Sequence, residues 1–248
     1  MTLGSAGVAD QLTSSRSANT SRKPETSLVN HHTLKQRHRT LREGYPPNLN
    51  LRIHRALSWL KRAEMATAES DDDGRFIFLW IAFNAAYASE IDERCRLSEQ
   101  ATFMGFLERL CALDTGKRID SLVWQEFAGG IRVLLDTPFV FQSFWDFQAG
   151  KLDEEEWLAR FAKGKKIAQQ ALAGGRTPAL LGVVFNRLYT LRNQLIHGGA
   201  TWNSKVNRKQ LRDCGQLLSK LVPVILDLML DHPEIDWGPA CYPVLENA

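Results

Sequence analysis

The sequence predicts an all-α protein. Apolar residues recur at the three- and four-residue spacing of amphipathic helices along most of the chain, whereas the alternation typical of half-buried strands is almost absent. No internal repeat is visible. The chain has 248 residues, of which 44% are hydrophobic, so it is long enough for one large domain or two small ones. We therefore expect a helical bundle.

The first 44 residues differ from the rest. They lack apolar periodicity and carry seven Lys and Arg against three acids, a net charge of +4. Residues 1–44 are therefore predicted to be a disordered basic tail, although their richness in Ser, Thr and Arg also resembles an organelle transit peptide. The whole chain has a net charge of +3, so the residues after this segment have a net charge of −1. Any affinity of that part for nucleic acid must therefore come from a local basic patch.

The folded part begins after Tyr45-Pro46-Pro47 and is expected over residues 45–235. Asn50 is predicted to cap a first helix over 51–68. Several prolines follow the last helical pattern, so residues 236–248 are expected to form an irregular tail.

The segment 76–87 is apolar on every side of a helix, which predicts a place in the middle of the bundle. The acidic loop before it, 71–74, suits the positive end of that helix. Asn84 is its one polar interruption and must find a hydrogen-bond partner there.

Further helices are predicted over 103–113, 117–136 and 154–172, the last opening with a capping box in which Asp153 precedes Glu156. A final helix over 207–230 has apolar residues that alternate steps of three and four, a seam typical of bundle packing.

Cysteine usage and hydropathy bear on the compartment. The four cysteines are scattered and form no Cys-x-x-Cys pair, which argues against a zinc site or a disulfide framework and fits a reducing cytoplasm. No apolar run reaches the length that spans a bilayer, and no apolar signal core is visible at the N-terminus.

The histidines do not indicate a metal site. His31, His32 and His38 in the tail lack metal-ligand partners, and His54 is interpreted as helix surface. We expect no metal, no cofactor and no membrane contact.

The most informative helix is predicted over 178–197, with Thr177 as its cap and Pro178 in its first turn. It ends in Arg192-Asn193-Gln194-Leu195-Ile196-His197, and Gly198-Gly199 follows. At 100° per residue, one side is apolar and is predicted to be buried. That side carries Val184, Leu188, Leu191 and Leu195.

The opposite side of this helix is polar. Four polar residues point within about 40° of the direction of Asn186, namely Asn186 itself, Thr190, Asn193 and His197. Arg192 lies on one flank of this face. Two interpretations are open. The face is either an ordinary solvated surface, with His197 favoured by the helix dipole, or it faces a partner chain or a substrate.

The Arg192-Asn193-x-x-x-His197 segment, its glycine end and its late position in an all-α chain resemble the HEPN superfamily, named for higher eukaryotes and prokaryotes nucleotide-binding. The segment 79–87 is also similar to a helix of bacterial members with an ApeA-like domain. The resemblance covers about residues 50–230 and implies a helical bundle that pairs as a homodimer, with two Arg-x4-6-His motifs in one composite cleft. Residues 100–175 would be a family-specific insertion. Many members are metal-independent endoribonucleases of toxin–antitoxin or anti-phage systems, and others bind partners without catalysis.

The resemblance implies a mechanism in which RNA supplies its own nucleophile, the 2′-hydroxyl. His197 would be the acid or the base, because imidazole titrates near neutral pH, and its assignment stays open. Arg192 would hold the charged phosphate. Asn193 would either orient the imidazole or bind a phosphate oxygen.

A cluster of basic residues follows the motif. Lys205, Arg208, Lys209 and Arg212 either contact the RNA backbone or form a solvated basic turn. Trp202 either stacks on a base or packs the loop.

We therefore expect a dimeric, metal-independent endoribonuclease that acts on single-stranded RNA in defence, with an antitoxin or a sensor protein as a further partner. The first alternative is a non-catalytic HEPN module that binds nucleotide, RNA or a protein. The second is an unrelated helical scaffold in which the motif is a coincidence.

Overall fold

The computed structural model describes residues 29–88, 96–205 and 207–242. Within these ranges every regular element is helical, which confirms the predicted all-α fold. The α-helices are α1 His31–Leu41, α2 Pro47–Ala68, α3 Asp72–Tyr87, α4 Arg96–Leu113, α5 Arg118–Ser121, α6 Ala128–Asp136, α7 Gln142–Gln148, α8 Glu154–Ala173, α9 Thr177–Ile196 and α10 Arg208–Asp231. Shorter helical turns lie between some of them: η1 Arg42–Gly44, η3 Leu122–Glu126 and η4 Pro138–Val140.

Helix α3 lies at the centre of the core, as its uniformly apolar sequence predicted. It packs against α2 and α10, and Phe76 and Phe83 are fully buried. The Phe83 ring has ring neighbours at centroid distances of 4.5–6.4 Å. These neighbours are Trp80, Tyr87, Phe103, Phe106 and Phe185. Each buried aromatic side chain contributes roughly 1.5–3 kcal/mol, so this cluster is a main source of stability.

The hydrogen bond expected for Asn84 is not found within the described residues. Its Oδ1 is buried there and accepts no hydrogen bond. The side-chain oxygen of Asn84 therefore lacks the hydrogen-bond partner that its place in an apolar helix led us to expect.

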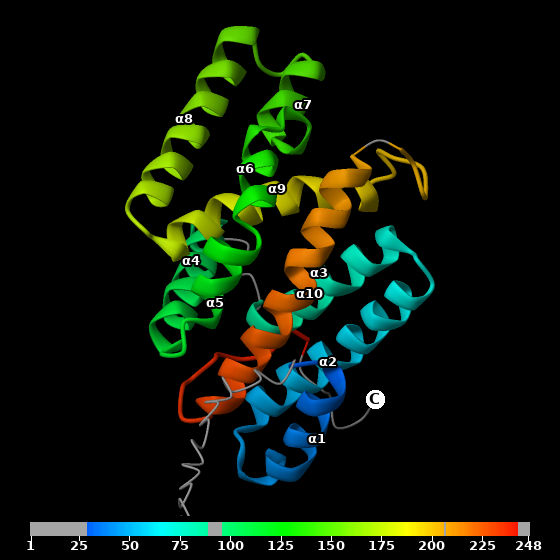
Figure 1. The fold of residues 1–248 in the computed structure, drawn as a ribbon, viewed down its shortest axis with the longest axis vertical. Coiled ribbons are helices and arrows are strands. Elements are labelled where there is room, and N and C mark those ends of the chain that lie inside the picture. Colours follow the sequence, from blue (N-terminus) through cyan, green and yellow to red (C-terminus); the bar gives the residue numbers. More distant parts are fainter. Residues whose placement is uncertain (1–28, 89–95, 206, 243–248) are drawn as a thin grey trace, which may run out of the picture.

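Helix α9 crosses the middle of the molecule, with α6, α7 and α8 to one side and α1, α2 and α3 to the other (Figure 1). It contacts α3, α4, α6, α8 and η4. Among the helices between α3 and α9, α4, α6 and α8 pack against α9, so this part of the chain adds a second group of helices to the bundle.

The predicted disordered tail over 1–44 is wrong for residues 31–44, which form α1 and η1; residues 1–28 lie outside the described part of the chain. Asn30 and Thr33 form a capping box at the start of α1. Leu34 is buried, and Arg37 pairs with the carboxylates of Asp227 and Asp231 on α10 at 2.6 and 2.7 Å. Long-range pairing thus holds a helix whose own sequence has little apolar character.

Helix α2 begins at Pro47, three residues before the predicted cap. Asn50 lies inside the helix, and its amide nitrogen donates to the carbonyl oxygens of Arg42 and Tyr45 at 2.7 and 3.0 Å. Asn50 therefore stabilises the corner between α1 and α2 instead of capping a helix.

The helix predicted over 117–136 is divided into α5, the π-helical turn η3 and α6. Trp124 in η3 donates its indole N–H to the hydroxyl of Thr177 at 2.7 Å, and Thr177 in turn donates to Asp120. Thr177 is thus a buried tertiary contact at the start of α9, and it does not cap that helix.

The segment after α10, residues 232–242, forms no helix, and two arginines of α2 hold its backbone. Arg52 is fully buried. It donates to the carbonyl oxygens of Gly238 and Pro239 and to those of Ala86 and Ala88 at the end of α3. Arg52 therefore joins the C-terminal segment to the α2–α3 pair through a buried charge.

Candidate functional site

The end of α9 is a Schellman motif. The Gly198 N–H donates to the Leu195 carbonyl, and the Gly199 N–H donates to the Gln194 carbonyl at 2.7 Å. Gly198 has a φ of +68°, the left-handed conformation that glycine adopts at no steric cost. The glycine pair therefore ends the helix as predicted and makes His197 its C-cap.

Replacing Gly198 with alanine is expected to destabilise the protein by about 1–2 kcal/mol, the cost of a Cβ in left-handed backbone. For a domain of this size the melting temperature falls by roughly 2–8 °C. Gly105→Ala is the matched control, because Gly105 is an exposed glycine inside α4 and a Cβ there meets nothing within 4 Å. That variant should melt higher, since alanine favours the helix by about 0.5–1 kcal/mol. Equal melting temperatures for the two variants would contradict the assigned cap.

Arg192 and Asn193 are brought together. The Arg192 Nη1 donates to the Asn193 Oδ1 at 2.8 Å, and the guanidinium carbon lies 5.9 Å from the centre of the Tyr189 ring. The Arg192 Nε is buried and has no hydrogen-bond partner within the described residues. Because its oxygen already accepts from the arginine, the amide N–H groups of Asn193 are the ones directed away from Arg192 and able to donate to a ligand.

His197 is not joined to this pair. Its side chain is exposed, and its ring makes no hydrogen bond or ion pair with the described residues. Five residues separate it from Arg192, so the two side chains leave the helix about 140° apart. The structure therefore brings Arg192 and Asn193 together within one chain and leaves His197 open to solvent.

The polar face of α9 is less exposed than the sequence predicted. Asn186 and His197 are exposed, but Thr190 is buried and donates its hydroxyl to the Asn186 carbonyl. Helix α6 and the turn η4 pack against α9 and cover part of this side. The expectation that Thr190 points away from the core is therefore wrong.

Arg187 is a buried cation that the sequence reasoning missed. It is 2% exposed, and its guanidinium carbon lies 4.1 Å from the Phe141 ring centre and 5.6 Å from that of Phe161. Burial lowers its pKa to about 10. At 100° per residue Arg187 stands beside the apolar face that contains Leu188, and this position was the available signal.

The basic residues after the motif divide into two kinds. Arg208 pairs with Asp73 at 3.0 Å, and Arg212 pairs with Asp72 at 2.8 Å. These acids begin α3, so the basic start of α10 is neutralised by the acidic start of a neighbouring helix. The remaining two, Lys205 and Lys209, are exposed and have no ion-pair partner within the described residues.

Hydrogen bonds hold the connection between α9 and α10 against neighbouring elements within the described residues. Gln194 donates to the Phe139 carbonyl of η4 at 2.6 Å and accepts from the Asn207 side chain at 2.9 Å. Trp202 is 76% exposed, and its indole N–H donates to Asp71 at 3.3 Å. Trp202 therefore does not pack the loop, and its ring faces solvent.

Apolar side chains are exposed around the motif. Tyr189 is 51% exposed and Ile196 is 48% exposed, and both belong to α9. Phe139 is 47% exposed, and its carbonyl oxygen accepts a hydrogen bond from Gln194.

Two of the cysteines, Cys111 and Cys214, are poor candidates for a nucleophile. Burial raises the pKa of Cys111 to about 12 and also raises that of Cys214, so both thiols are protonated and poor nucleophiles. Within the described residues, no three His, Cys, Asp or Glu side chains gather in a way that could hold a metal ion. No helix in the same ranges has the length and apolar character needed to cross a membrane.

Comparisons with protein-family models, with curated proteins and with solved structures give no match. The resemblance to the HEPN superfamily therefore rests on the residues of the motif, on the segment 79–87 and on the all-α context, and no comparison supports it.

Proposed function

We propose that this protein is a metal-independent endoribonuclease of the HEPN type that cleaves single-stranded RNA. The end of α9 carries the proposal. There Arg192 is already oriented by Asn193, and an exposed His197 follows about one and a half turns later. A fixed cation and an accessible imidazole are the two groups that cleavage through the 2′-hydroxyl requires.

The complete site is a composite of two copies. Within one chain Arg192 and His197 diverge by about 140°, so a single copy does not direct both groups at one phosphate. The exposed Tyr189 and Ile196 on the same helix give a second copy an apolar surface to cover. In a twofold dimer Arg192 of one chain and His197 of the other then face the same cleft.

The chemistry follows from these groups. One His197 removes the proton of the 2′-hydroxyl, and the other protonates the departing 5′-oxygen. Arg192 binds the phosphate oxygens while negative charge builds on them, and the Asn193 amide donates to one of the same oxygens. The products are a 2′,3′-cyclic phosphate and a 5′-hydroxyl. DNA lacks the nucleophile and is not cleaved.

The biological setting belongs to the same proposal. A ribonuclease without a metal requirement fits a cytoplasmic toxin–antitoxin or anti-phage system, in which an antitoxin or a sensor protein restrains it. The exposed Trp202 and the unpaired Lys205 and Lys209 are the groups nearest in sequence to His197 that contact either RNA or such a partner.

A second function, a non-catalytic HEPN module, is favoured by one observation. The Arg192 guanidinium is tied to Asn193 and to the Tyr189 ring, and no contact joins it to His197 within the described residues. This module would bind nucleotide, RNA or a protein through the same surface without cleaving.

The experiment that tests the proposal uses the full chain, a 5′-labelled single-stranded RNA and excess EDTA. We expect cleavage to products with 2′,3′-cyclic phosphate ends, none from DNA of the same sequence, and a dimeric mass in light scattering. Binding of RNA without cleavage over a panel of sequences would support the non-catalytic module. A monomer that neither binds nor cleaves would mean that the motif is a coincidence.

A further inference from the structure

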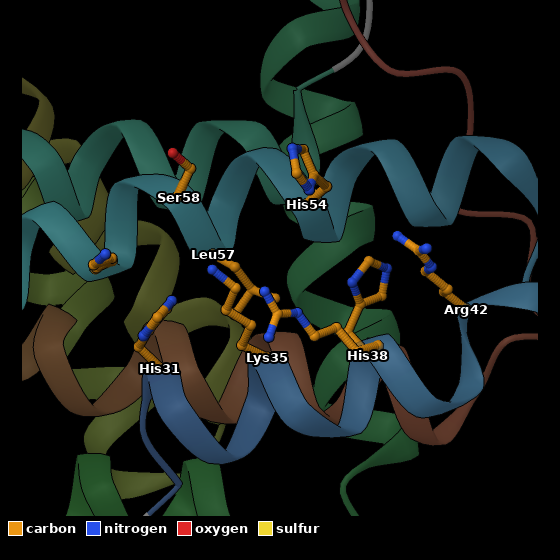
Figure 2. A pocket seen from close by; sticks show the side chains of 9 residues that line it. His31, Lys35, His38, Arg42, His54, Leu57 and Ser58 are labelled. Carbon is orange, nitrogen blue, oxygen red and sulfur yellow. The ribbon is translucent and has the colours of Figure 1, made fainter.

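A groove lined by basic side chains lies between α1 and α2 (Figure 2). Its volume is about 360 Å³, within the usual range for small-molecule sites. Four of its lining residues are positively charged: Lys35 and Arg39 belong to α1, Arg42 begins the turn η1 that follows it, and Lys61 belongs to α2. No acidic side chain lines it.

The four cations of the groove are not neutralised by the described part of the protein. None of them forms an ion pair or a side-chain hydrogen bond there, whereas Arg37, on another face of α1, is held by two carboxylates. Glu64, an acid at one end of the groove, accepts the backbone N–H of His31. The four positive charges repel one another, so an anion that enters the groove lowers their electrostatic free energy.

The spacing of these charges indicates the kind of anion. Lys35, Arg39 and Arg42 follow one another at intervals of four and three, so they lie along one side of α1 and its C-cap over about 10 Å. Figure 2 shows the Lys35 and Arg42 side chains in the space between the two helices. A single phosphate reaches only one or two of them, while a row of two or three linked phosphates meets them all.

The length of the groove favours a small anion over an RNA strand. Beyond Arg42 the chain turns through η1 into α2, so the basic row ends at a corner and does not continue as a channel. A polynucleotide backbone needs a track that extends past the site at both ends. The closed corner suits a ligand that ends within the groove.

The floor of the groove is held rigidly. His38 is 6% exposed, and its Nε2 lies 3.0 Å from the Asn50 Oδ1. Since the Asn50 amide nitrogen already donates to two carbonyls, its oxygen must accept, and Nε2 of His38 carries the proton. Such a fixed corner lowers the ordering cost of binding.

The groove is separate from the motif in α9. Arg37 ties α1 to Asp227 and Asp231 near the C-terminal end of α10, whereas Asn207, just before α10, is bonded to Gln194 in the motif. Helix α10 has 24 residues and is about 36 Å long. The two sites therefore lie at opposite ends of one long helix, and neither depends on the other.

We propose that the α1–α2 groove binds a small anion with two or more linked phosphates. The test is isothermal titration of the full chain with inorganic triphosphate, beside inorganic monophosphate and a short single-stranded RNA. The expected result is one site for triphosphate, with monophosphate at least roughly tenfold weaker because it meets fewer charges. Arg39→Gln and Lys61→Gln should each weaken triphosphate binding roughly tenfold.

Lys163→Gln is the matched control, since Lys163 is an exposed lysine on α8 and the charge change is the same. Ser58→Glu gives a second variant, which places a carboxylate at the exposed rim of the groove and should abolish binding without disturbing the core. Absence of triphosphate binding would overturn the proposal. Equal weakening by Lys163→Gln, or RNA that binds through the groove where triphosphate does not, would also overturn it.

Discussion

Replacing His197 with alanine is expected to lower RNA cleavage by roughly two to four orders of magnitude, the usual contribution of a general acid or base. Because the side chain is exposed and makes no hydrogen bond within the described residues, the melting temperature should not change by more than about 1 °C. The measurement is the initial rate of cleavage of the labelled RNA in EDTA, together with a thermal melt of each protein.

His232→Ala is the matched control for this variant. His232 follows α10 at its far end, and its ring contacts only the exposed Glu234 among the described residues. Its cleavage rate should equal that of the parent. If His197→Ala cleaves at the parent rate while the parent leaves cyclic-phosphate ends, the imidazole is not the proton carrier and the proposed mechanism is wrong.

Replacing Arg52 with methionine is expected to destabilise the protein by about 3–5 kcal/mol, because several buried carbonyl oxygens lose their hydrogen-bond donor and each costs about 1–3 kcal/mol. Methionine preserves much of the volume but leaves the carbonyls of Ala86, Ala88, Gly238 and Pro239 without their donor. The melting temperature should fall by roughly 10 °C. Thermal melts followed by circular dichroism give this value.

The matched control is Arg55→Met, three residues later on the same helix. Arg55 donates to the carbonyls of Cys241 and Tyr242, and its side chain is partly exposed. Water replaces the Arg55 guanidinium as the donor to these two carbonyls, so the free energy of unfolding is expected to fall by less than about 1 kcal/mol. Similar melting temperatures for the two variants would show that burial does not strengthen the Arg52 contacts.

Local sequence predicts the elements whose signals are local. The apolar run of α3 can be satisfied only in the centre of a bundle, and it lies there. The Asp153 side chain accepts the Glu156 N–H at 2.7 Å and begins α8, and Gly198 ends α9. Caps and glycines act on their own neighbours, so one sequence suffices to find them.

The predictions that were wrong concern residues whose partners lie far away along the chain. Helix α1 has few apolar residues, and its partners Asp227 and Asp231 lie 190 or more residues away, where no periodicity can indicate them. Thr190 is buried because α6 and η4 cover a side of α9 that its own sequence leaves polar. The positions of Arg192 and His197 on their helix were predictable, whereas the Arg192–Asn193 bond and the exposed Trp202 required the fold.

The contacts of Arg52 also constrain the order in which the chain folds. Two of its acceptors lie 186 and 187 residues further along, almost at the end of the described chain. During synthesis the α2–α3 pair emerges long before those carbonyls exist, and its buried guanidinium then lacks half of the acceptors that Gly238, Pro239 and the end of α3 together supply. The contacts of Arg52 are therefore completed only after the last segment of the described chain has been synthesised and has docked onto the α2–α3 pair.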